Sequence, residues 1–327
     1  MFKKRNNKRL KPMNIFIPTI IFPTILLCIT LFTVYNTGKY QNWNNSNTSQ
    51  TSILRFNKSS DKNNSEIPMI RNINSKNAIL VENSSGKIIA QKNKDAKCYP
   101  ASLTKIMTTI VAIENLNDLD VEIPIKSSVF ESLKNSNASM AGFLPDEKVK
   151  AKDALYGIML PSGAESSLGV AEYISGSEDK FVDLMNKKAR ELGMKNTHYT
   201  NTIGLHNSNH YTTSNDLSIL LDYALENDTF KSIFTTDRYS TSPTNLNSAG
   251  ITFRSTTFDK IDSENFGRGK VIGGKTGFTD KAGLCLASLL EKNGEEYILI
   301  TTGAEKTNNE SSSNIIDAFN IYDTYFH

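Results

Sequence analysis

The first 74 residues differ from the rest of the chain in their pattern of hydrophobic and polar positions. An almost uncharged apolar run covers residues 13–35 and follows a basic segment at residues 1–12. About 20 apolar residues cross a bilayer as a helix, and Lys and Arg clustered before such a helix stay in the cytoplasm. Residues 36–74 are rich in Asn, Ser, Thr and Lys and show no steady apolar period. The pattern predicts a cytoplasmic tail at 1–12, a transmembrane signal-anchor helix at 13–35 and a polar flexible linker at 36–74.

A cleaved signal peptide is the alternative interpretation of residues 13–35. No small-x-small cleavage site stands near the end of this run, and the run is longer than a typical signal-peptide core. We therefore expect a single-pass membrane anchor, with the remainder of the chain on the outer side of the membrane. Secretion after signal cleavage stays open as the alternative.

Beyond the predicted linker, strand and helix periods alternate. Short apolar runs at 78–81 and 87–90 flank the turn residues Asn-Ser-Ser-Gly and predict a β-hairpin. Two more strands are predicted at 284–290 and 297–302, on either side of Lys-Asn-Gly. Apolar positions at helical spacing predict helices at 100–116, 153–159, 166–174, 178–192, 216–225 and 314–326.

Strands near both ends, with helices between them, predict one α+β domain over residues 75–327. The first hairpin is expected to join the late strands in one antiparallel sheet. The mostly helical middle of the domain is expected to pack over one edge of that sheet.

The charge distribution argues against a nucleic-acid-binding protein. The formal net charge is +3, yet residues 1–12 hold six basic side chains and no acidic one, so the remaining chain is net acidic. Cys98 and Cys285 lie beyond the predicted membrane helix and could form a disulfide, although their spacing does not require one. No Cys/His cluster has metal-ligand spacing, so we expect neither a metal nor another cofactor.

A possible nucleophile stands in the stretch Ser102-Leu103-Thr104-Lys105. A hydroxyl of ordinary pKa needs a base beside it, and residues three apart share one face of a helix. The Lys105 amine can act as that base only when it is uncharged. Burial and a second nearby cation, for which Lys275 is the candidate, would both lower its pKa.

A second candidate motif, Lys275-Thr276-Gly277, follows two glycines. Small residues before and after it would let a strand edge lie against a ligand. A lysine and a hydroxyl at such an edge suit a substrate that carries a carboxylate. A third short motif, Ser162-Gly163-Ala164, lies between two predicted helices.

Two other interpretations of these residues are less favoured. Residues 269–276 match the phosphate-loop pattern G-x-x-x-x-G-K-[ST], but the residues that follow do not predict the helix that a phosphate loop requires. We therefore expect no nucleotide. The histidines lack an accompanying G-x-S-x-G nucleophile motif, so we expect His198 and His210 to be structural or to line the rim of the site.

The three motifs, in this order, resemble those of the D-alanyl-D-alanine carboxypeptidases, which are low-molecular-mass penicillin-binding proteins. The resemblance extends over residues 77–326. It implies the penicillin-binding protein and β-lactamase-like transpeptidase fold, in which helices sandwich an antiparallel sheet beside a mostly helical subdomain. The stretches that carry it further are residues 100–108, 160–163, 181–186, 191–198, 204–206, 210–211 and 274–279.

The resemblance implies a serine acyl-enzyme mechanism that acts on peptidoglycan stem pentapeptides. Ser102 would attack the carbonyl of the penultimate D-Ala, Lys105 would accept its proton, and Ser162 would relay a proton to the leaving amine. β-Lactams would acylate Ser102 as substrate mimics. The residues implied in substrate binding are Lys275, Thr276, Gly277 and Phe278, with the backbone N–H groups of Ser102 and Phe278 as the oxyanion hole.

This chain departs from the family pattern at two positions. Ala164 stands where the family usually has Asn, whose amide orders the site, so that Glu165 or a water would have to substitute. Asn215 stands where many relatives have Arg before the residue matching Asp216. A catalytically weak or silent wall-binding protein is therefore the main alternative to a carboxypeptidase, and a β-lactamase is a more distant one.

Overall fold

The computed structural model describes residues 66–261, 269–306 and 312–326. The predicted cytoplasmic tail, the predicted membrane helix at 13–35 and most of the predicted linker lie outside these residues. Within the described ranges, no helix is both long enough and apolar enough to cross a membrane.

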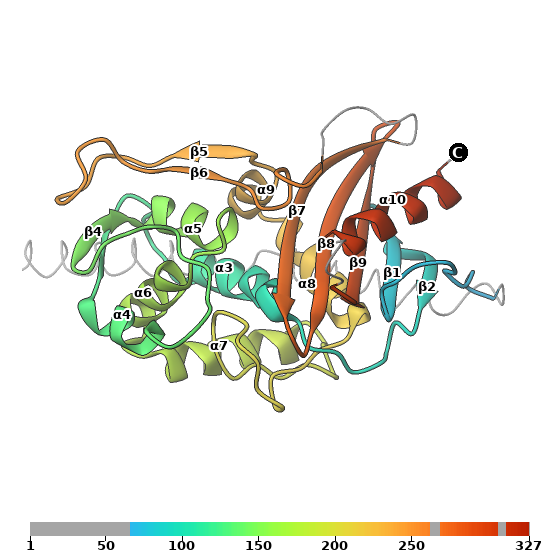
Figure 1. The fold of residues 1–327 in the computed structure, drawn as a ribbon, viewed down its shortest axis with the longest axis horizontal. Helices are drawn as coiled ribbons and strands as arrows, with labels where there is room; N and C mark the ends of the chain where they lie inside the picture. The colour runs from blue at the N-terminus through green and yellow to red at the C-terminus, as the bar shows by residue number, and fades with distance from the viewer. Residues whose placement is uncertain (1–65, 262–268, 307–311, 327) are drawn as a thin grey trace, which may run out of the picture. The chain divides into compact units, whose positions relative to one another are not determined.

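The main sheet has five strands in the order β2-β1-β9-β8-β7, and neighbouring strands are antiparallel (Figure 1). The early hairpin thus pairs with the late strands, as the sequence predicts, and β7 is the last strand on its side. The turn between β8 and β9 contains Asn293 and Gly294, both with positive φ, a combination typical of a two-residue hairpin. The strands are β1 (Asn77–Glu82), β2 (Lys87–Lys92), β7 (Lys270–Thr279), β8 (Gly283–Lys292) and β9 (Glu295–Ala304).

Between β2 and β7 the chain is mostly helical, and two small two-stranded sheets complete this region. The first small sheet pairs β3 (Glu122–Ile125) with β4 (Glu147–Lys150), and the second pairs β5 (Arg238–Ser240) with β6 (Thr252–Arg254). The helices are η1 (Ala101–Leu103), α3 (Thr104–Asn115), α4 (Ser127–Leu133), α5 (Ala151–Met159), α6 (Ala164–Ser175), α7 (Glu178–Glu191), α8 (Ser214–Leu225), α9 (Asp228–Phe234) and the C-terminal α10 (Ser313–Tyr325).

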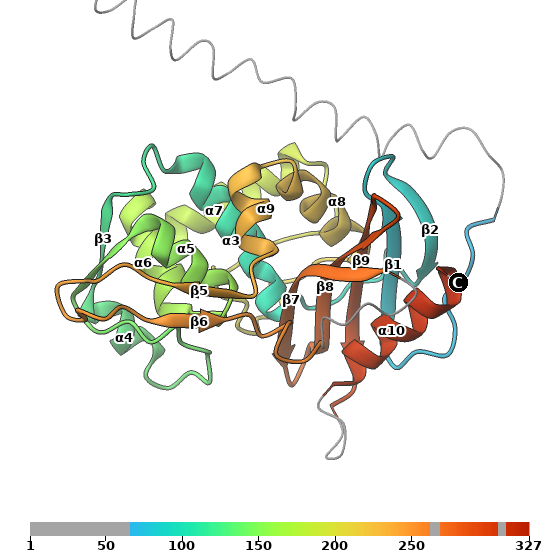
Figure 2. The same ribbon diagram turned by 90° about the horizontal axis from the view of Figure 1, so that it is seen from above.

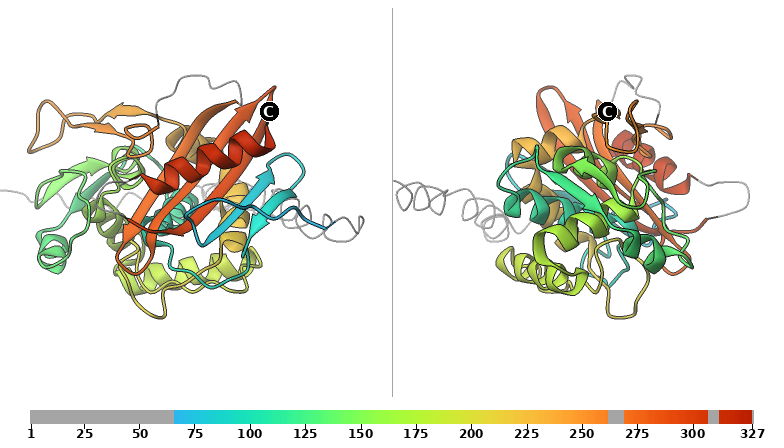
Figure 3. Two further views of the ribbon diagram at one scale, coloured as in Figure 1. Left: turned by 45° about the vertical axis from the view of Figure 1, so that its right-hand side comes forward. Right: turned by 90° about the vertical axis from the view of Figure 1, so that its left-hand side faces the viewer.

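Helices cover both faces of the main sheet. Helix α10 lies across one face, where Ile315 and Ile321 pack with Leu80, Leu286 and Leu299 in one buried cluster (Figure 3). Helices α3 and α8 pack toward the other face in a second, larger cluster. Alternate residues of a strand point to opposite faces, so buried side chains on both faces explain the long apolar runs of β8 and β9.

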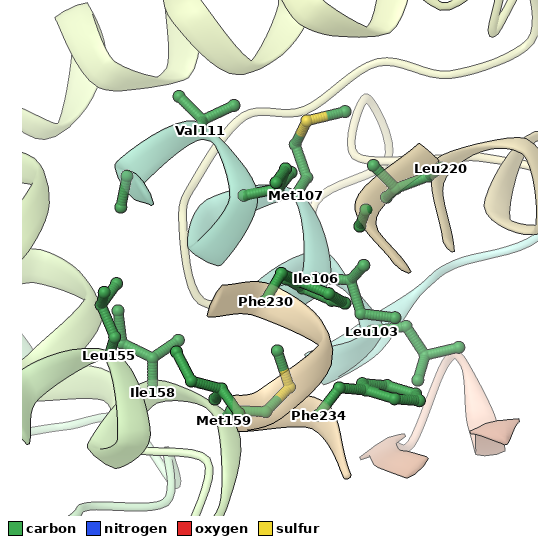
Figure 4. Packing of buried hydrophobic residues seen from close by; sticks show 14 of the residues in the cluster. Leu103, Ile106, Met107, Val111, Leu155, Ile158, Met159, Leu220, Phe230 and Phe234 are labelled. Carbon is green, nitrogen blue, oxygen red and sulfur yellow. The ribbon is translucent and has the colours of Figure 1, made fainter. Parts of the chain in front are cut away.

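The helical region lies beside β7 and is built around α3 (Figure 2). In the close view, Ile106 of α3 lies near Phe230 of α9, and Leu103 and Met159 belong to the same buried cluster as Phe234 (Figure 4). Full burial of one such side chain contributes about 1.5–3 kcal/mol to folding. This packing fixes the start of α3, which carries the first candidate motif, next to β7.

The predicted helices are found within a few residues of their expected bounds. Ser177 caps α7 by accepting a hydrogen bond from the Lys180 N–H, and Thr213 caps α8 through the Asp216 N–H. The sequence prediction missed α4, α9 and the two small sheets, which are short, and it placed only a strand edge at the Lys275 motif, whereas β7 runs from Lys270 to Thr279. Packing also begins ahead of the predicted domain start at residue 75, because Ile70 is buried and its N–H donates to the Gln91 carbonyl.

Candidate active site

Ser102 and Lys105 lie where η1 passes into α3. Ser102 is partly exposed, whereas the Lys105 side chain is fully buried and its Nζ donates to the Ile203 carbonyl at 2.9 Å. Burial lowers the pKa of Lys105 to about 7, although the negative charge of Glu165 acts in the opposite direction. A substantial fraction of the Lys105 amine is therefore uncharged at neutral pH.

The backbone before Ser102 is held in an unusual conformation. Ala101 has φ of 47°, in the left-handed region that a side-chain-bearing residue enters only at a cost of about 1–2 kcal/mol. The Thr104 hydroxyl donates to the Ala101 carbonyl at 2.8 Å. Gly204 has φ of 85° and packs so closely that a Cβ there would lie 1.9 Å from this carbonyl oxygen. Position 204 therefore has no space for a side chain, because the backbone around Ala101 and Ser102, which we call the nucleophile loop, packs directly against it.

A buried histidine completes this support. The Thr200 N–H donates to His210 Nδ1 at 3.0 Å, so His210 Nε2 carries the proton and donates to the Thr104 hydroxyl at 2.8 Å. Burial, followed by the charges of His198 and His206, lowers the pKa of His210 to about 4, which keeps the ring neutral. His210 is thus structural, as the sequence suggested, whereas His198 is exposed.

Strand β7 forms one side of the site. A Cβ at Gly277 would lie 2.9 Å from the Ser102 nitrogen, so only glycine lets β7 approach the nucleophile this closely.

The other motif residues of β7 differ in burial. Lys275 is fully buried, and burial followed by the charges of Lys105 and Lys260 lowers its pKa. The Thr276 hydroxyl bonds to the Thr256 hydroxyl at 2.8 Å. Phe278, in contrast, is 39% exposed.

The Ser162-Gly163-Ala164 turn leads into α6, and the charge of Glu165 in the first turn of α6 acts on Lys105, so we call this turn and the start of α6 the helical side. Ser162 has φ of 66° and is buried, and its Oγ has no hydrogen-bond partner among the described residues. The Gly163 N–H donates to the Gly157 carbonyl, and the Ala164 N–H donates to the Ser139 carbonyl, both at 2.8 Å. These two hydrogen bonds fix the backbone of the turn, and the Ser162 hydroxyl is available to form a hydrogen bond with a ligand.

The two residues after this turn face different surroundings. Ala164 is fully buried in an apolar cluster with Leu168 and Ile203. Glu165 is also fully buried, and its Oε1 accepts hydrogen bonds from the N–H groups of Gly142, at 2.7 Å, and Phe143, at 3.2 Å. Its Oε2 has no partner among the described residues. One oxygen of Glu165 thus holds the loop before β4 in place through two hydrogen bonds. The negative charge of Glu165 also raises the pKa of Lys105.

The structure also bears on the phosphate-loop pattern, the possible disulfide and Asn215. Lys275 lies in the middle of a strand with no helix after it, which excludes the phosphate-loop geometry for residues 269–276. Cys98 and Cys285 are both buried free thiols, so the possible disulfide is not formed. Asn215 lies in the first turn of α8, where its N–H donates to the Lys94 carbonyl.

The sequence reasoning missed the roles of Ala101, Thr104 and Gly204. In the sequence, Thr104 is only a variable position of the first motif. Its hydrogen bond with His210 joins residues that are 106 positions apart, which no local pattern reveals. Gly204 and His210 could have been identified from the family resemblance, because they lie in the family-like stretches 204–206 and 210–211.

The whole described domain has the fold of the penicillin-binding transpeptidases. The crystal structure of the Streptomyces K15 DD-transpeptidase superposes with a TM-score of 0.68 at 25% sequence identity, covering 78% of this chain and 98% of that one. The family model described as D-alanyl-D-alanine carboxypeptidase matches residues 61–306. The chain therefore belongs to the D-alanyl-D-alanine carboxypeptidase family.

Curated relatives carry the same description. The chain is similar to the D-alanyl-D-alanine carboxypeptidase DacF of Bacillus subtilis, with 33% identity over 259 residues that cover 76% of this chain and 63% of the relative. It is also similar to a D-alanyl-D-alanine carboxypeptidase of a Streptomyces species (strain K15), with 29% identity over 67% of this chain and 77% of the relative. The match thus spans slightly less than two thirds of the Bacillus protein's length.

Proposed function

We propose that this protein is a serine-type D-Ala-D-Ala carboxypeptidase that removes the terminal D-Ala from peptidoglycan stem pentapeptides. The observation that carries the proposal is the buried Lys105 amine, whose pKa is lowered to about 7, one helical turn from Ser102. Family membership supplies the substrate class, and the close approach of Gly277 to the Ser102 nitrogen supports the same assignment.

In the proposed reaction, Ser102 Oγ attacks the carbonyl carbon of the penultimate D-Ala while uncharged Lys105 Nζ accepts the hydroxyl proton. The oxyanion that forms is held by the backbone N–H groups of Ser102 and Phe278, because donors fixed in advance need no reorganisation when the charge develops. The C–N bond then breaks, Ser162 relays a proton to the leaving D-Ala amine, and an ester on Ser102 remains. Water hydrolyses this ester and regenerates the hydroxyl.

Lys275 and Thr276 would hold the terminal carboxylate of the substrate. Burial and the neighbouring cations Lys105 and Lys260 disfavour the charged form of Lys275. A bound carboxylate supplies the missing counter-charge, so that substrate binding favours protonation of this amine. The same pair would hold the carboxylate of a β-lactam, which would then acylate Ser102.

Hydrolysis of diacetyl-Lys-D-Ala-D-Ala tests this function. We expect the purified protein to release free D-Ala, and the Ser102→Ala variant to release none. Absence of D-Ala release by a folded wild-type protein would contradict the proposal.

A penicillin-binding protein with weak or no peptidase activity is the second candidate. It is favoured by Ala164, which cannot supply the amide hydrogen bonds of the usual Asn and is turned into an apolar cluster. This candidate predicts stable labelling of Ser102 by penicillin without peptide turnover. A β-lactamase would instead release hydrolysed penicillin quickly.

We also propose that residues 13–35 anchor the protein in the bacterial cytoplasmic membrane, with the catalytic domain outside. The support is the apolar run after a basic segment. Membrane fractionation with external protease treatment tests this, and N-terminal sequencing of the mature protein separates an intact anchor from a cleaved signal peptide. Recovery of the intact chain in the cytosol would contradict both arrangements.

A further inference from the structure

A pocket of about 510 Å³ lies at the end of β7 that carries Phe278. Its lining includes four lysines, Lys76, Lys97, Lys281 and Lys306, which together with Phe278 define what we call the basic pocket. The lysines come from four separate parts of the chain: the residue before β1, the loop before η1, the β7–β8 turn and the segment after β9. The fold therefore gathers four lysines at one end of the sheet, and the Lys97 Nζ lies over the Tyr211 ring, 3.9 Å from its centroid, beside the pocket lining.

Within the part of the chain that the structure describes, no salt bridge holds these four lysines. Asp280 and Glu305 also line the pocket, but among the described residues none of the four lysine Nζ atoms lies within 4.0 Å of a carboxylate oxygen. Lys306 Nζ instead lies over the Phe278 ring, 4.7 Å from its centroid. An excess of like charge in a concave site attracts an anion.

The proposed reaction places part of the substrate near this pocket. With the terminal carboxylate at Lys275 and Thr276, and the reacting carbonyl at the Phe278 N–H, the substrate backbone runs antiparallel to β7. β7 is the last strand of its sheet, so an extended peptide can add along its outer edge. At about 3.3 Å per α-linked residue, the second residue upstream of the cleaved bond comes close to the level of the β7–β8 turn, and a γ-linked third residue, whose main chain is longer, reaches farther along it. This turn lines the basic pocket.

We propose that the basic pocket is a subsite for carboxylates on the upstream part of the stem peptide. This inference rests on the proposed carboxypeptidase function and adds a preference for acidic peptides to it. The β7 residue that lines the basic pocket, Phe278, lies three residues beyond Lys275, so the proposal places the upstream part of the peptide at the pocket while the terminal carboxylate is held at Lys275.

Two matched peptides test the preference. N-acetyl-L-Ala-γ-D-Glu-L-Lys-D-Ala-D-Ala carries a free α-carboxylate on its third residue upstream of the cleaved bond, and the amidated γ-D-Gln peptide lacks only this charge. We expect kcat/KM for the acidic peptide to be about fivefold higher at low salt, which is the effect of a partly exposed ion pair. Added salt should reduce the difference because it screens exposed charges.

Matched variants assign the effect to the pocket. The double variant Lys281→Gln and Lys306→Gln should lose the difference between the two peptides while retaining turnover of diacetyl-Lys-D-Ala-D-Ala. Lys87→Gln, at an exposed position at the start of β2, serves as the control and should keep the difference. Equal kcat/KM for the two peptides with the wild-type protein would overturn the inference.

Two further measurements separate this inference from its alternatives. Affinities of both peptides for the Ser102→Ala variant decide the preference even if the wild-type protein releases no D-Ala, an outcome that would reject the proposed function alone. Isothermal titration with poly(glycerol phosphate) probes a separate polymer. Lysine-dependent binding of that polymer, without discrimination between the peptides, would overturn the inference and make the pocket a docking site for a wall polyanion.

Discussion

On the sheet side of the site, backbone packing leaves little freedom: a Cβ at Gly277 would lie 2.9 Å from the Ser102 nitrogen, and Lys275 on β7 is fully buried. On the helical side, Ser162 Oγ, Glu165 Oε2 and Ser166 Oγ are all buried, and each lacks a partner among the described residues. A buried polar atom without a partner costs about 1–3 kcal/mol. The sheet side is thus preformed, whereas the helical side holds polar groups whose partner must come from a ligand or a water.

This difference matches the sequence. The sheet side keeps the Lys-Thr-Gly motif of the family, and the helical side departs from the family at Ala164. We therefore expect substitutions on the sheet side to reduce turnover strongly, and substitutions on the helical side to change stability or pH dependence more than turnover. The predictions below test this contrast, in order of decreasing expected effect.

Lys105→Met removes the proposed base and keeps a buried side chain of similar length. We expect kcat/KM for diacetyl-Lys-D-Ala-D-Ala to fall by about 10²–10⁴-fold, which is the usual contribution of a general base. Thermal unfolding monitored by circular dichroism should show that the variant remains folded. Activity within threefold of wild type would mean that Lys105 is not the base.

Gly277→Ala tests the sheet side. The added methyl would lie 2.9 Å from the Ser102 nitrogen and must push the nucleophile loop away from β7. Because the Ser102 N–H is a proposed oxyanion donor, we expect kcat to fall by about 10²–10³-fold. Gly294→Asn is the control, since Asn tolerates positive φ and nothing lies within 4 Å of a Cβ there. Equal loss in both variants would count against a specific role for Gly277.

Ala164→Asn tests the helical side by restoring the usual family residue. Its side chain would enter the apolar cluster around Leu168 and Ile203, where an unpaired amide costs about 1–3 kcal/mol. We expect a lower unfolding temperature and no gain in D-Ala release, with Ala164→Ser as a smaller polar control. A marked gain in activity would show that Ala164 alone weakens this side of the site.

Glu165→Gln tests the electrostatic coupling across the site. The negative charge of Glu165 raises the pKa of Lys105, so its removal should lower that pKa. Since the uncharged amine is the active form, the acidic limb of the pH profile of kcat/KM should move to lower pH. Gln can still accept the N–H bonds of Gly142 and Phe143 through its remaining oxygen. A shift to higher pH would contradict the assigned sign.

Much of the fold could be predicted because its long elements have strong periods. In α7, Phe181, Met185 and Ala189 recur at helical spacing, all three are buried, and Gly193 with φ of 74° follows. The sequence predicts one hairpin near each end of the domain and expects both hairpins to share one sheet. The antiparallel pairing of β1 with β9 confirms this expectation. The short elements α4, α9, β5 and β6 give too few residues for a period to stand out.

The site was only partly predictable for a different reason. The spacing of Ser102 and Lys105 is local, so the sequence reveals it directly. The contacts of Thr104 with His210, and of Glu165 with the Gly142 N–H, join distant segments that no local pattern connects. The sequence also named Lys275 as a cation that would lower the Lys105 pKa. Burial is the main cause in the structure, and the coupling appears as the effect of Lys105 on Lys275.

The central claim is that an uncharged, buried Lys105 activates Ser102 for acylation. The most direct test is the rate of covalent attachment of benzylpenicillin between pH 5 and 9, followed by intact-protein mass spectrometry, with Ser102→Ala as the control. We predict one adduct on Ser102, formed at a rate that rises with pH through about 7 as Lys105 loses its proton. An adduct that persists in Ser102→Ala, a pH-independent rate, or no adduct at all would contradict the claim.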